Sequence, residues 1–332
     1  MKKSPIKIMF YLILFISTMI SITSTSWLGA WMGLEINLLS FLPLISNQSS
    51  YNNSMIKYFI TQTLASVILI TSIITLMINM FKSKEIINIM VAMSLLMKMG
   101  AAPMHFWFPE VMEFLEWKNC MLLMTWQKIA PMIMISYIDM NQLFMTIIII
   151  MSAMVGAILG LNQISLRLIL AYSSINHLGW MLASMQTSMI TWTWYFLAYS
   201  LLTSLIALSF KSININFINE MFNSKNNNKT DKLNSALMLM SLGGMPPFLG
   251  FLPKWMVMQD LMQLNMYLTS TTLIVSSTIT LYFYMKMFIS AGILSIKETK
   301  WSNNNTPIKN KLLMLMNTMS TMGLVMSPLI LK

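Results

Sequence analysis

The sequence has few of the residues that build disulfides, metal sites and soluble surfaces. It contains one cysteine, Cys120, two histidines and only 9% charged residues among 332 positions. A single cysteine excludes an intramolecular disulfide and any metal site built from cysteines. The charged fraction is far below the globular average of about 25%, which excludes an ordinary soluble domain and indicates a polytopic membrane protein.

Motifs for nucleotide, metal and nucleophilic chemistry are also missing. There is no G-x-G-x-x-G, and Gly243-Gly244 is followed by Met-Pro-Pro instead of Lys and Ser or Thr. Two histidines, one cysteine and scattered carboxylates form no ligand cluster, and no nucleophile has the partners of a triad. We therefore expect this chain to bind no cofactor and no metal of its own.

What the sequence does contain is a series of long apolar runs. Hydrophobic residues make up 56% of the chain and include 39 methionines. A helix needs about 20 mostly apolar residues to cross a bilayer. The runs predict one all-α transmembrane domain over residues 1–332, with about eleven membrane-spanning helices and a loop or short surface helix at 212–232. The predicted helices are 5–24, 27–46, 55–80, 86–109, 119–138, 142–161, 166–185, 190–211, 234–264, 267–293 and 307–331.

The cations are distributed unevenly between the loops. If the N-terminus faces the positive side of the membrane, fourteen Lys and Arg residues lie on that side and three on the other. Because this bias sets membrane-protein orientation, we predict a matrix or cytoplasmic N-terminus and, with an odd helix count, a C-terminus on the opposite side. The net charge of +11 is accounted for by these scattered segment ends, so no nucleic-acid partner is expected.

Two predicted helices share a pattern of glycine and prolines. It occurs as Gly100-x-x-Pro103-x5-Pro109 and as Gly244-x-x-Pro247-x5-Pro253. Proline removes a helix hydrogen bond, so we expect both helices to be broken, one near Pro103 and the other near Pro247–Pro253.

The matching helices are the fourth and the ninth, which are five helices apart. Because five is odd, two copies of a five-helix unit would insert with opposite orientation. The pattern therefore predicts an inverted repeat of residues 5–138 and 142–293, followed by a final helix at 307–331. A chance match of one short motif is the alternative.

Five ionisable residues lie at mid-span depth in these helices: Glu35, Lys98, Lys128, His177 and Lys254. A charge at that depth costs at least about 2.5–3.5 kcal/mol, so each is a candidate functional residue. For each residue the alternative is a polar side chain that only holds helices together.

This set of residues suits proton transfer. Burial disfavours the charged form of both lysine and carboxylic acid, so both can exchange protons near neutral pH. A neighbouring carboxylate holds a proton on lysine and releases it when the carboxylate moves or is neutralised, and histidine carries protons through either ring nitrogen. We therefore predict a proton relay along the five residues.

Other polar residues are interpreted as peripheral. We expect His105 and Trp107 to lie at the membrane interface. Glu110, Glu113 and Glu116 follow helical spacing and are interpreted as a solvated face or a contact with another subunit.

Four segments carry a family resemblance. They are Trp31-Met-Gly-Leu-Glu35-Ile-Asn, Lys98-Met-Gly-Ala-Ala-Pro-Met-His-Phe-Trp-Phe-Pro-Glu110, Ala171-Tyr-Ser-Ser-Ile-Asn-His177-Leu-Gly-Trp and Gly244-Met-Pro-Pro-Phe-Leu-Gly-Phe-Leu-Pro-Lys254-Trp. Together they resemble the mitochondrial NADH dehydrogenase subunit 2 family, in an arthropod-like form and over nearly the full length. Members of that family are antiporter-like subunits in the membrane arm of respiratory complex I.

The resemblance implies a role for each candidate residue. It implies that the chain pumps protons in the mitochondrial inner membrane as part of NADH:ubiquinone oxidoreductase, with no redox chemistry of its own. Glu35 and Lys98 would form the charge pair and Lys128 the central relay. His177 and Lys254 would link the relay to the far half-channel.

The resemblance also implies cofactors and partners. NADH, FMN, iron–sulfur clusters and ubiquinone would be bound elsewhere in the complex. The partners would be other membrane-arm subunits, including the neighbouring antiporter-like subunit 4 and subunit 4L, accessory subunits and membrane lipid. Two other functions are compatible with the residues: a free-standing cation/proton antiporter, and a structural anchor subunit without transport.

Overall fold

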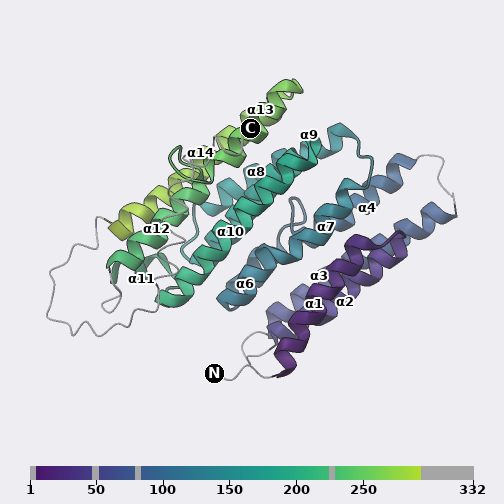
Figure 1. Ribbon diagram of the computed structural model, residues 1–332, viewed down its shortest axis with the longest axis horizontal. Coiled ribbons are helices and arrows are strands. Elements are labelled where there is room, and N and C mark those ends of the chain that lie inside the picture. The colour runs from purple at the N-terminus through teal and green to yellow at the C-terminus, as the bar shows by residue number, and fades with distance from the viewer. Residues whose placement is uncertain (1–4, 47–51, 79–83, 224–228, 293–332) are drawn as a thin grey trace. The chain divides into compact units, whose positions relative to one another are not determined.

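The computed structural model describes residues 5–46, 52–78, 84–223 and 229–292 (Figure 1). These residues form helices, together with one isolated bridge between Ser165 and Phe217. By contact clustering the chain divides into two compact units, Met1–Met151 and Ser152–Lys332. The all-α fold class predicted from the sequence is confirmed.

The first unit holds the N-terminal helices. They are α1 (Pro5–Thr23), α2 (Trp27–Ile45), α3 (Asn52–Met77), α4 (Lys84–Met99), α5 (Trp107–Phe114), α6 (Trp117–Met124), α7 (Trp126–Ser136) and the start of α8 (Gln142–Gly160). Helix α2 packs on both α1 and α3, and Figure 1 shows these three side by side. Helix α4 packs on α3 and α7, so α2, α3, α4 and α7 can contribute side chains to one interior.

The second unit holds the remaining described helices. They are the end of α8, α9 (Leu166–Thr187), α10 (Met189–Ile213), α11 (Ile218–Asn223), α12 (Lys229–Gly243), α13 (Phe251–Gln263) and α14 (Tyr267–Gly292). Helix α9 contacts α10, α13 and α14, while α12 contacts α10 and α14. Helix α9 is thus surrounded by its neighbours, and most of its residues from Leu166 to Ser184 are buried.

Six of the described helices are each long and apolar enough to cross a membrane. They are α1, α2, α3, α8, α10 and α14. The segments predicted at 86–109 and 234–264 are instead divided, into α4 and α5 and into α12 and α13. The predicted eleventh helix, 307–331, lies outside the described residues.

The two breaks have the same local structure. Helix α4 ends at Met99 and is followed by Gly100 with φ +76°. The N–H groups of Gly100 and Ala101 donate to the carbonyls of Met97 and Leu96 at 3.2 and 3.1 Å. Helix α12 ends at Gly243 and is followed by Gly244 with φ +77°, where two bonds of the same pattern form. This is the Schellman arrangement, which requires a positive φ and so favours glycine. The breaks predicted from the shared proline pattern are therefore present.

The expectation of a continuous fifth helix over 119–138 is wrong. The chain divides at Thr125, between α6 and α7, where φ is −111° and ψ is −72°. The Thr125 hydroxyl donates a 2.7 Å hydrogen bond to the Met121 carbonyl, and such side-chain bonds compete with the helix ladder. In the segment 212–232 the structure places the short helix α11, and α12 begins at Lys229 instead of residue 234.

Candidate functional site: buried lysines beside broken helices

Lys98 lies at the end of α4, immediately before the first break. Lys98 is 8% exposed. Its backbone carbonyl accepts a 3.2 Å hydrogen bond from Nε2 of Gln62 on α3. The carbonyl groups at a helix C-terminus carry partial negative charge, which stabilises a cation there. The helix break therefore explains how a lysine is accommodated at this depth.

Glu35 lies on α2 and is partly exposed. It is close enough to Lys98 for a coulombic interaction, although these two described side chains form no direct ion pair. A charge pair of these two residues, as the resemblance implies, would therefore act through space or through an intervening group.

Lys128 is the most deeply buried of the candidate residues, with 1% exposure. It is the third residue of α7, and its Nζ lies 5.4 Å from the ring centroid of Phe108 on α5. An ammonium over an aromatic face is attracted by the ring quadrupole. The N-terminal end of a helix disfavours a cation, so α7 itself opposes the charge that the ring attracts.

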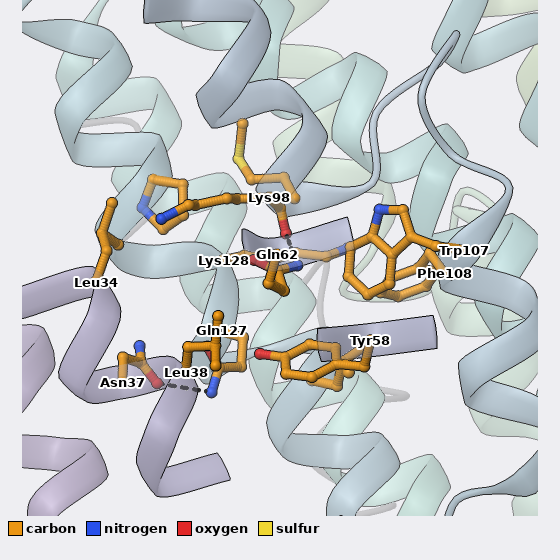
Figure 2. Close-up of a pocket in the computed structure, with 13 residues that line it drawn as sticks. Leu34, Asn37, Leu38, Tyr58, Gln62, Lys98, Trp107, Phe108, Gln127 and Lys128 are labelled. Carbon is orange, nitrogen blue, oxygen red and sulfur yellow. Dashed lines mark hydrogen bonds between the residues drawn. The ribbon is translucent and has the colours of Figure 1, made fainter. Parts of the chain in front are cut away.

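Lys98 and Lys128 line one small cavity in the first unit, shown in Figure 2. Its volume is about 20 Å³, which is enough to hold a water molecule. The lining combines the two lysines with amide and aromatic side chains. The residues are Leu34, Asn37, Leu38, Tyr58, Gln62, Lys98, Met99, Trp107, Phe108, Leu123, Gln127, Lys128 and Pro131.

Lys254 lies beside the second break and is 7% exposed. Its Nζ donates a 2.9 Å hydrogen bond to the carbonyl of Gly243, the last residue of α12. The same Nζ lies 5.7 Å from the ring centroid of Trp180 on α9. The cation is thus held by a helix C-terminus and an aromatic face.

His177 is buried on α9 and is 5% exposed. Its Nδ1 lies 2.8 Å from the hydroxyl of Tyr195 on α10, and its ring centroid is 5.1 Å from that of Tyr199. The Tyr199 hydroxyl is in turn hydrogen-bonded to Ser174. Hydroxyl groups that can donate and accept are suited to passing a proton to or from an imidazole.

Aromatic side chains connect His177 with Lys254 inside the second unit. Trp180 stacks on Tyr195 with ring centroids 6.4 Å apart and planes at 9°. Lys254 faces Trp180, and Tyr195 contacts His177, so the two candidates share one cluster of side chains from α9, α10 and α13.

The structure thus groups the sequence-predicted residues into two sets. Glu35, Lys98 and Lys128 belong to the first unit, and His177 and Lys254 to the second. Sequence reasoning missed the neutral groups beside them, whose burial costs less than that of a charge and so does not single them out. These are Asn37, Tyr58, Gln62 and Gln127 in the first unit, and Trp180, Tyr195 and Tyr199 in the second. The spacing of Tyr195 and Tyr199 on one helix face was an available signal.

His105 and Trp107, expected at the membrane interface, are buried within the protein, and their depth in the membrane stays a prediction. The two residues are 4% and 6% exposed, and Trp107 donates a 3.0 Å hydrogen bond to the carbonyl of Met97 at the end of α4. The Trp107 contact satisfies one of the backbone carbonyls that the end of α4 leaves without a partner within the helix.

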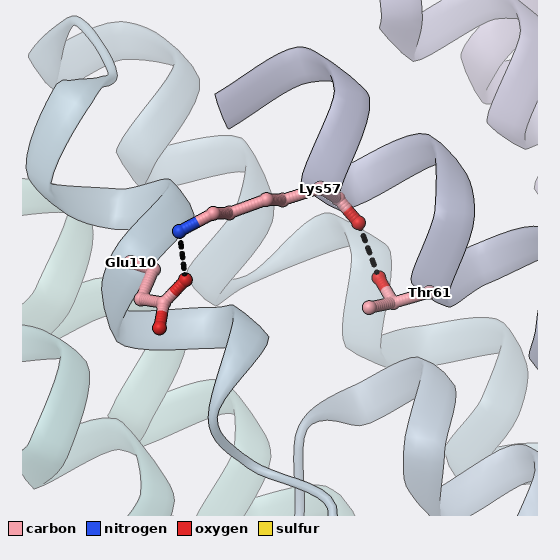
Figure 3. Close-up of polar contacts among 3 residues, drawn as sticks. All are labelled: Lys57, Thr61 and Glu110. Atoms are coloured by element: carbon pink, nitrogen blue, oxygen red, sulfur yellow. Dashed lines mark hydrogen bonds and ion pairs between the residues drawn. The ribbon is translucent and has the colours of Figure 1, made fainter. Parts of the chain in front are cut away.

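Glu110 lies outside this interior. Its side chain is about half exposed and forms an ion pair with Lys57 of α3, as Figure 3 shows. Glu113 and Glu116 are also exposed, in agreement with a solvated face. Among the described residues, no cluster of three or more His, Cys, Asp or Glu could hold a metal ion.

Comparison with known proteins decides the family. Residues 24–280 match the family described as "NADH:quinone oxidoreductase/Mrp antiporter, TM". NADH-ubiquinone oxidoreductase chain 2 of Locusta migratoria is 46% identical over 334 residues, which cover 98% of this chain and 97% of the relative. The chain belongs to the NADH-ubiquinone oxidoreductase chain 2 family. The resemblance predicted from the four sequence segments, including its arthropod-like character, is confirmed.

Solved structures share the fold of this chain 2 family member at low sequence identity. A chain of respiratory complex I from Thermus thermophilus has a TM-score of 0.87 and 18% identity, covering all of this chain and 80% of that one. A chain of the Mrp complex from Dietzia has a TM-score of 0.76 and 15% identity, covering 88% of this chain and 61% of that one. The fold is therefore shared by respiratory and antiporter complexes.

Proposed function

We propose that the chain works as the proton-translocating membrane subunit of an NADH–ubiquinone oxidoreductase, and that protons pass along its buried Glu, Lys and His residues. In the first unit the groups are Glu35, Lys98 and Lys128. In the second they are His177 and Lys254. The chain carries protons, while electron transfer from NADH to ubiquinone takes place elsewhere in the complex.

The observation that carries the proposal is the pair of lysines on one polar cavity. Burial in this lining disfavours the charged form of each lysine, so either can exchange a proton near neutral pH. A cavity that admits water also provides a hydrogen-bonded carrier between them. Two lysines that only held helices together would gain nothing from sharing a cavity.

In the second unit, hydrogen bonds to Lys254 and His177 also favour proton transfer. Lys254 is stabilised by the Gly243 carbonyl, and His177 is bonded to the Tyr195 hydroxyl. Both contacts can form and break without covalent change. The shared Schellman breaks at Gly100 and Gly244 also favour the proposed inverted repeat of residues 5–138 and 142–293.

Membership of the chain 2 family supports the mitochondrial inner membrane as the location, with other membrane-arm subunits of the complex as partners. We propose contacts with antiporter-like subunit 4 and subunit 4L, an N-terminus on the matrix side, and no cofactor bound by this chain. The N-terminal orientation rests on the fourteen-to-three cation asymmetry. Protease digestion of inverted and right-side-out membranes tests it, because the two termini should be cleaved from opposite faces.

A free-standing cation/proton antiporter is the second candidate, because a chain of an Mrp complex shares the fold. The two functions are separated by purification under mild detergent. A subunit of the oxidoreductase should purify only with partners that contain flavin and iron–sulfur clusters. Purification of the intact chain alone, with sodium/proton exchange after reconstitution, would overturn the proposal.

A further inference from the structure

A part-buried amide–amide hydrogen bond connects α2 with α7 in the first unit. Nε2 of Gln127 donates to Oδ1 of Asn37 at 2.8 Å, drawn as a dashed line in Figure 2. Asn37 is 3% exposed. Breaking the bond is costly on the Asn37 side, because a buried amide that loses a hydrogen-bond partner is left uncompensated.

The bond joins two helices that carry candidate proton carriers. Asn37 follows Glu35 by two residues on α2, and Gln127 directly precedes Lys128 on α7. Both amides also line the cavity shared by Lys98 and Lys128. A displacement of the helix that carries Glu35 is therefore transmitted to the helix that carries Lys128 through this bond.

Tyr58 completes the polar side of the cavity. Tyr58 is 3% exposed, and Figure 2 shows its hydroxyl turned toward the space beside Gln127. A buried tyrosine hydroxyl normally has a hydrogen-bond partner. A water molecule needs two to four polar partners, and the Tyr58 hydroxyl, the two amides and the lysines offer them within a volume that admits it.

We propose that Asn37 and Gln127 are a positioning pair for proton transfer, and that with Tyr58 they bind a water molecule between Lys98 and Lys128. The amide bond fixes the water and the distance between the two lysines. The proposal rests on the relay function proposed above and extends it to three residues that carry no charge.

The test uses the assembled complex in inner-membrane vesicles, with Asn37→Leu, Gln127→Met and Tyr58→Phe measured separately. Each change keeps most of the side-chain volume and removes one polar group. We expect proton pumping coupled to NADH oxidation to fall about tenfold per assembled complex for the two amide variants, and several-fold for Tyr58→Phe. The double variant Asn37→Gln/Gln127→Asn, which exchanges the two amides, should recover most of the lost rate.

Asn119→Leu is the matched control. Asn119 of α6 also donates a 2.8 Å hydrogen bond to α2, at the Leu44 carbonyl, but it does not line the cavity. It should lower the amount or thermal stability of the complex and leave pumping per assembled complex unchanged. Equal pumping defects in Asn119→Leu and Gln127→Met would show a structural role only and overturn the proposal.

The outcomes separate this inference from the relay itself. Wild-type pumping in both amide variants and in Tyr58→Phe, beside loss of pumping in Lys128→Met, would overturn the positioning pair and leave the relay standing. Wild-type pumping in Lys128→Met would instead contradict the relay on which the inference rests.

Discussion

The ammonium of Lys254 is hydrogen-bonded to the carbonyl of Gly243, the residue at which α12 ends. Lys98 occupies a related position, in the last turn of α4 before the first break. In the second unit the end of α12 presents a carbonyl group to a lysine, and this carbonyl offsets part of the cost of burying the charge. In the first unit the lysine belongs to the last turn of the helix that stops.

Gly244→Ala should disturb this arrangement in two ways. The backbone at Gly244 has φ +77°, which costs an L-residue about 1–2 kcal/mol, and a Cβ there would lie 3.0–3.3 Å from side-chain atoms of Lys254. We expect lower thermal stability of the complex and reduced pumping. Asn tolerates positive φ better than Ala does, so Gly244→Asn should relieve the backbone strain but still displace Lys254.

Stability and pumping measured on both variants separate the two effects. If Gly244→Asn recovers stability but not pumping, the contact with Lys254 matters for transport. If both variants pump at the wild-type rate, the position of Lys254 against the α12 terminus is unimportant for function.

Composition and charge were sufficient to predict the fold class and the five charged candidates. The cost of burying Lys98, Lys128 or Lys254 is large, so their presence in apolar runs is informative by itself. The glycine–proline pattern located both breaks because proline and positive φ have specific backbone requirements. The family resemblance then supplied roles that these residues alone left open.

The neutral groups of the site could not be predicted in the same way. Asn37, Gln127 and Tyr195 carry no charge, and only their neighbours in space show what they contact. The division at Thr125 was missed for a similar reason, because threonine also occurs within many continuous helices. The hydrogen bond from its hydroxyl to the Met121 carbonyl depends on the local backbone and cannot be inferred from the residue type. The burial of His105 within the protein was not predicted, because a histidine next to prolines is also compatible with a surface turn.

Tyr195→Phe should slow turnover without preventing assembly. The change removes the hydroxyl that lies 2.8 Å from Nδ1 of His177 and leaves the ring stacked on Trp180. We expect a several-fold lower rate of coupled NADH oxidation, since an imidazole without its partner is less well oriented to receive or release a proton.

Tyr282→Phe is the control for Tyr195→Phe, because Tyr282 on α14 is 65% exposed. It should leave both assembly and turnover unchanged. An unchanged rate in Tyr195→Phe as well would argue that His177 has no part in the relay.

Glu110→Gln tests whether the exposed ion pair with Lys57 belongs to the relay. The two side chains are 51% and 52% exposed, and surface ion pairs contribute at most about 1 kcal/mol. We expect a small loss of thermal stability that disappears at high salt, with pumping unchanged. Loss of pumping in an assembled Glu110→Gln complex would place this carboxylate on the proton path and contradict our assignment.

Lys128 gives the most direct test of the account, because it is the most buried titratable candidate and lines the cavity with Lys98. Lys128→Met keeps the volume of the side chain and removes its proton, while Lys128→Arg keeps a charge that does not release its proton near neutral pH. Removing the charge should not destabilise the fold, because a buried ammonium is costly.

The measurement is the number of protons pumped per NADH oxidised, together with the turnover rate, in membranes with matched amounts of assembled complex. The account predicts that both Lys128→Met and Lys128→Arg assemble and lose turnover or pumping. A Lys128→Met complex that assembles and pumps at the wild-type rate would show that the lysine is only structural and would contradict the proton relay.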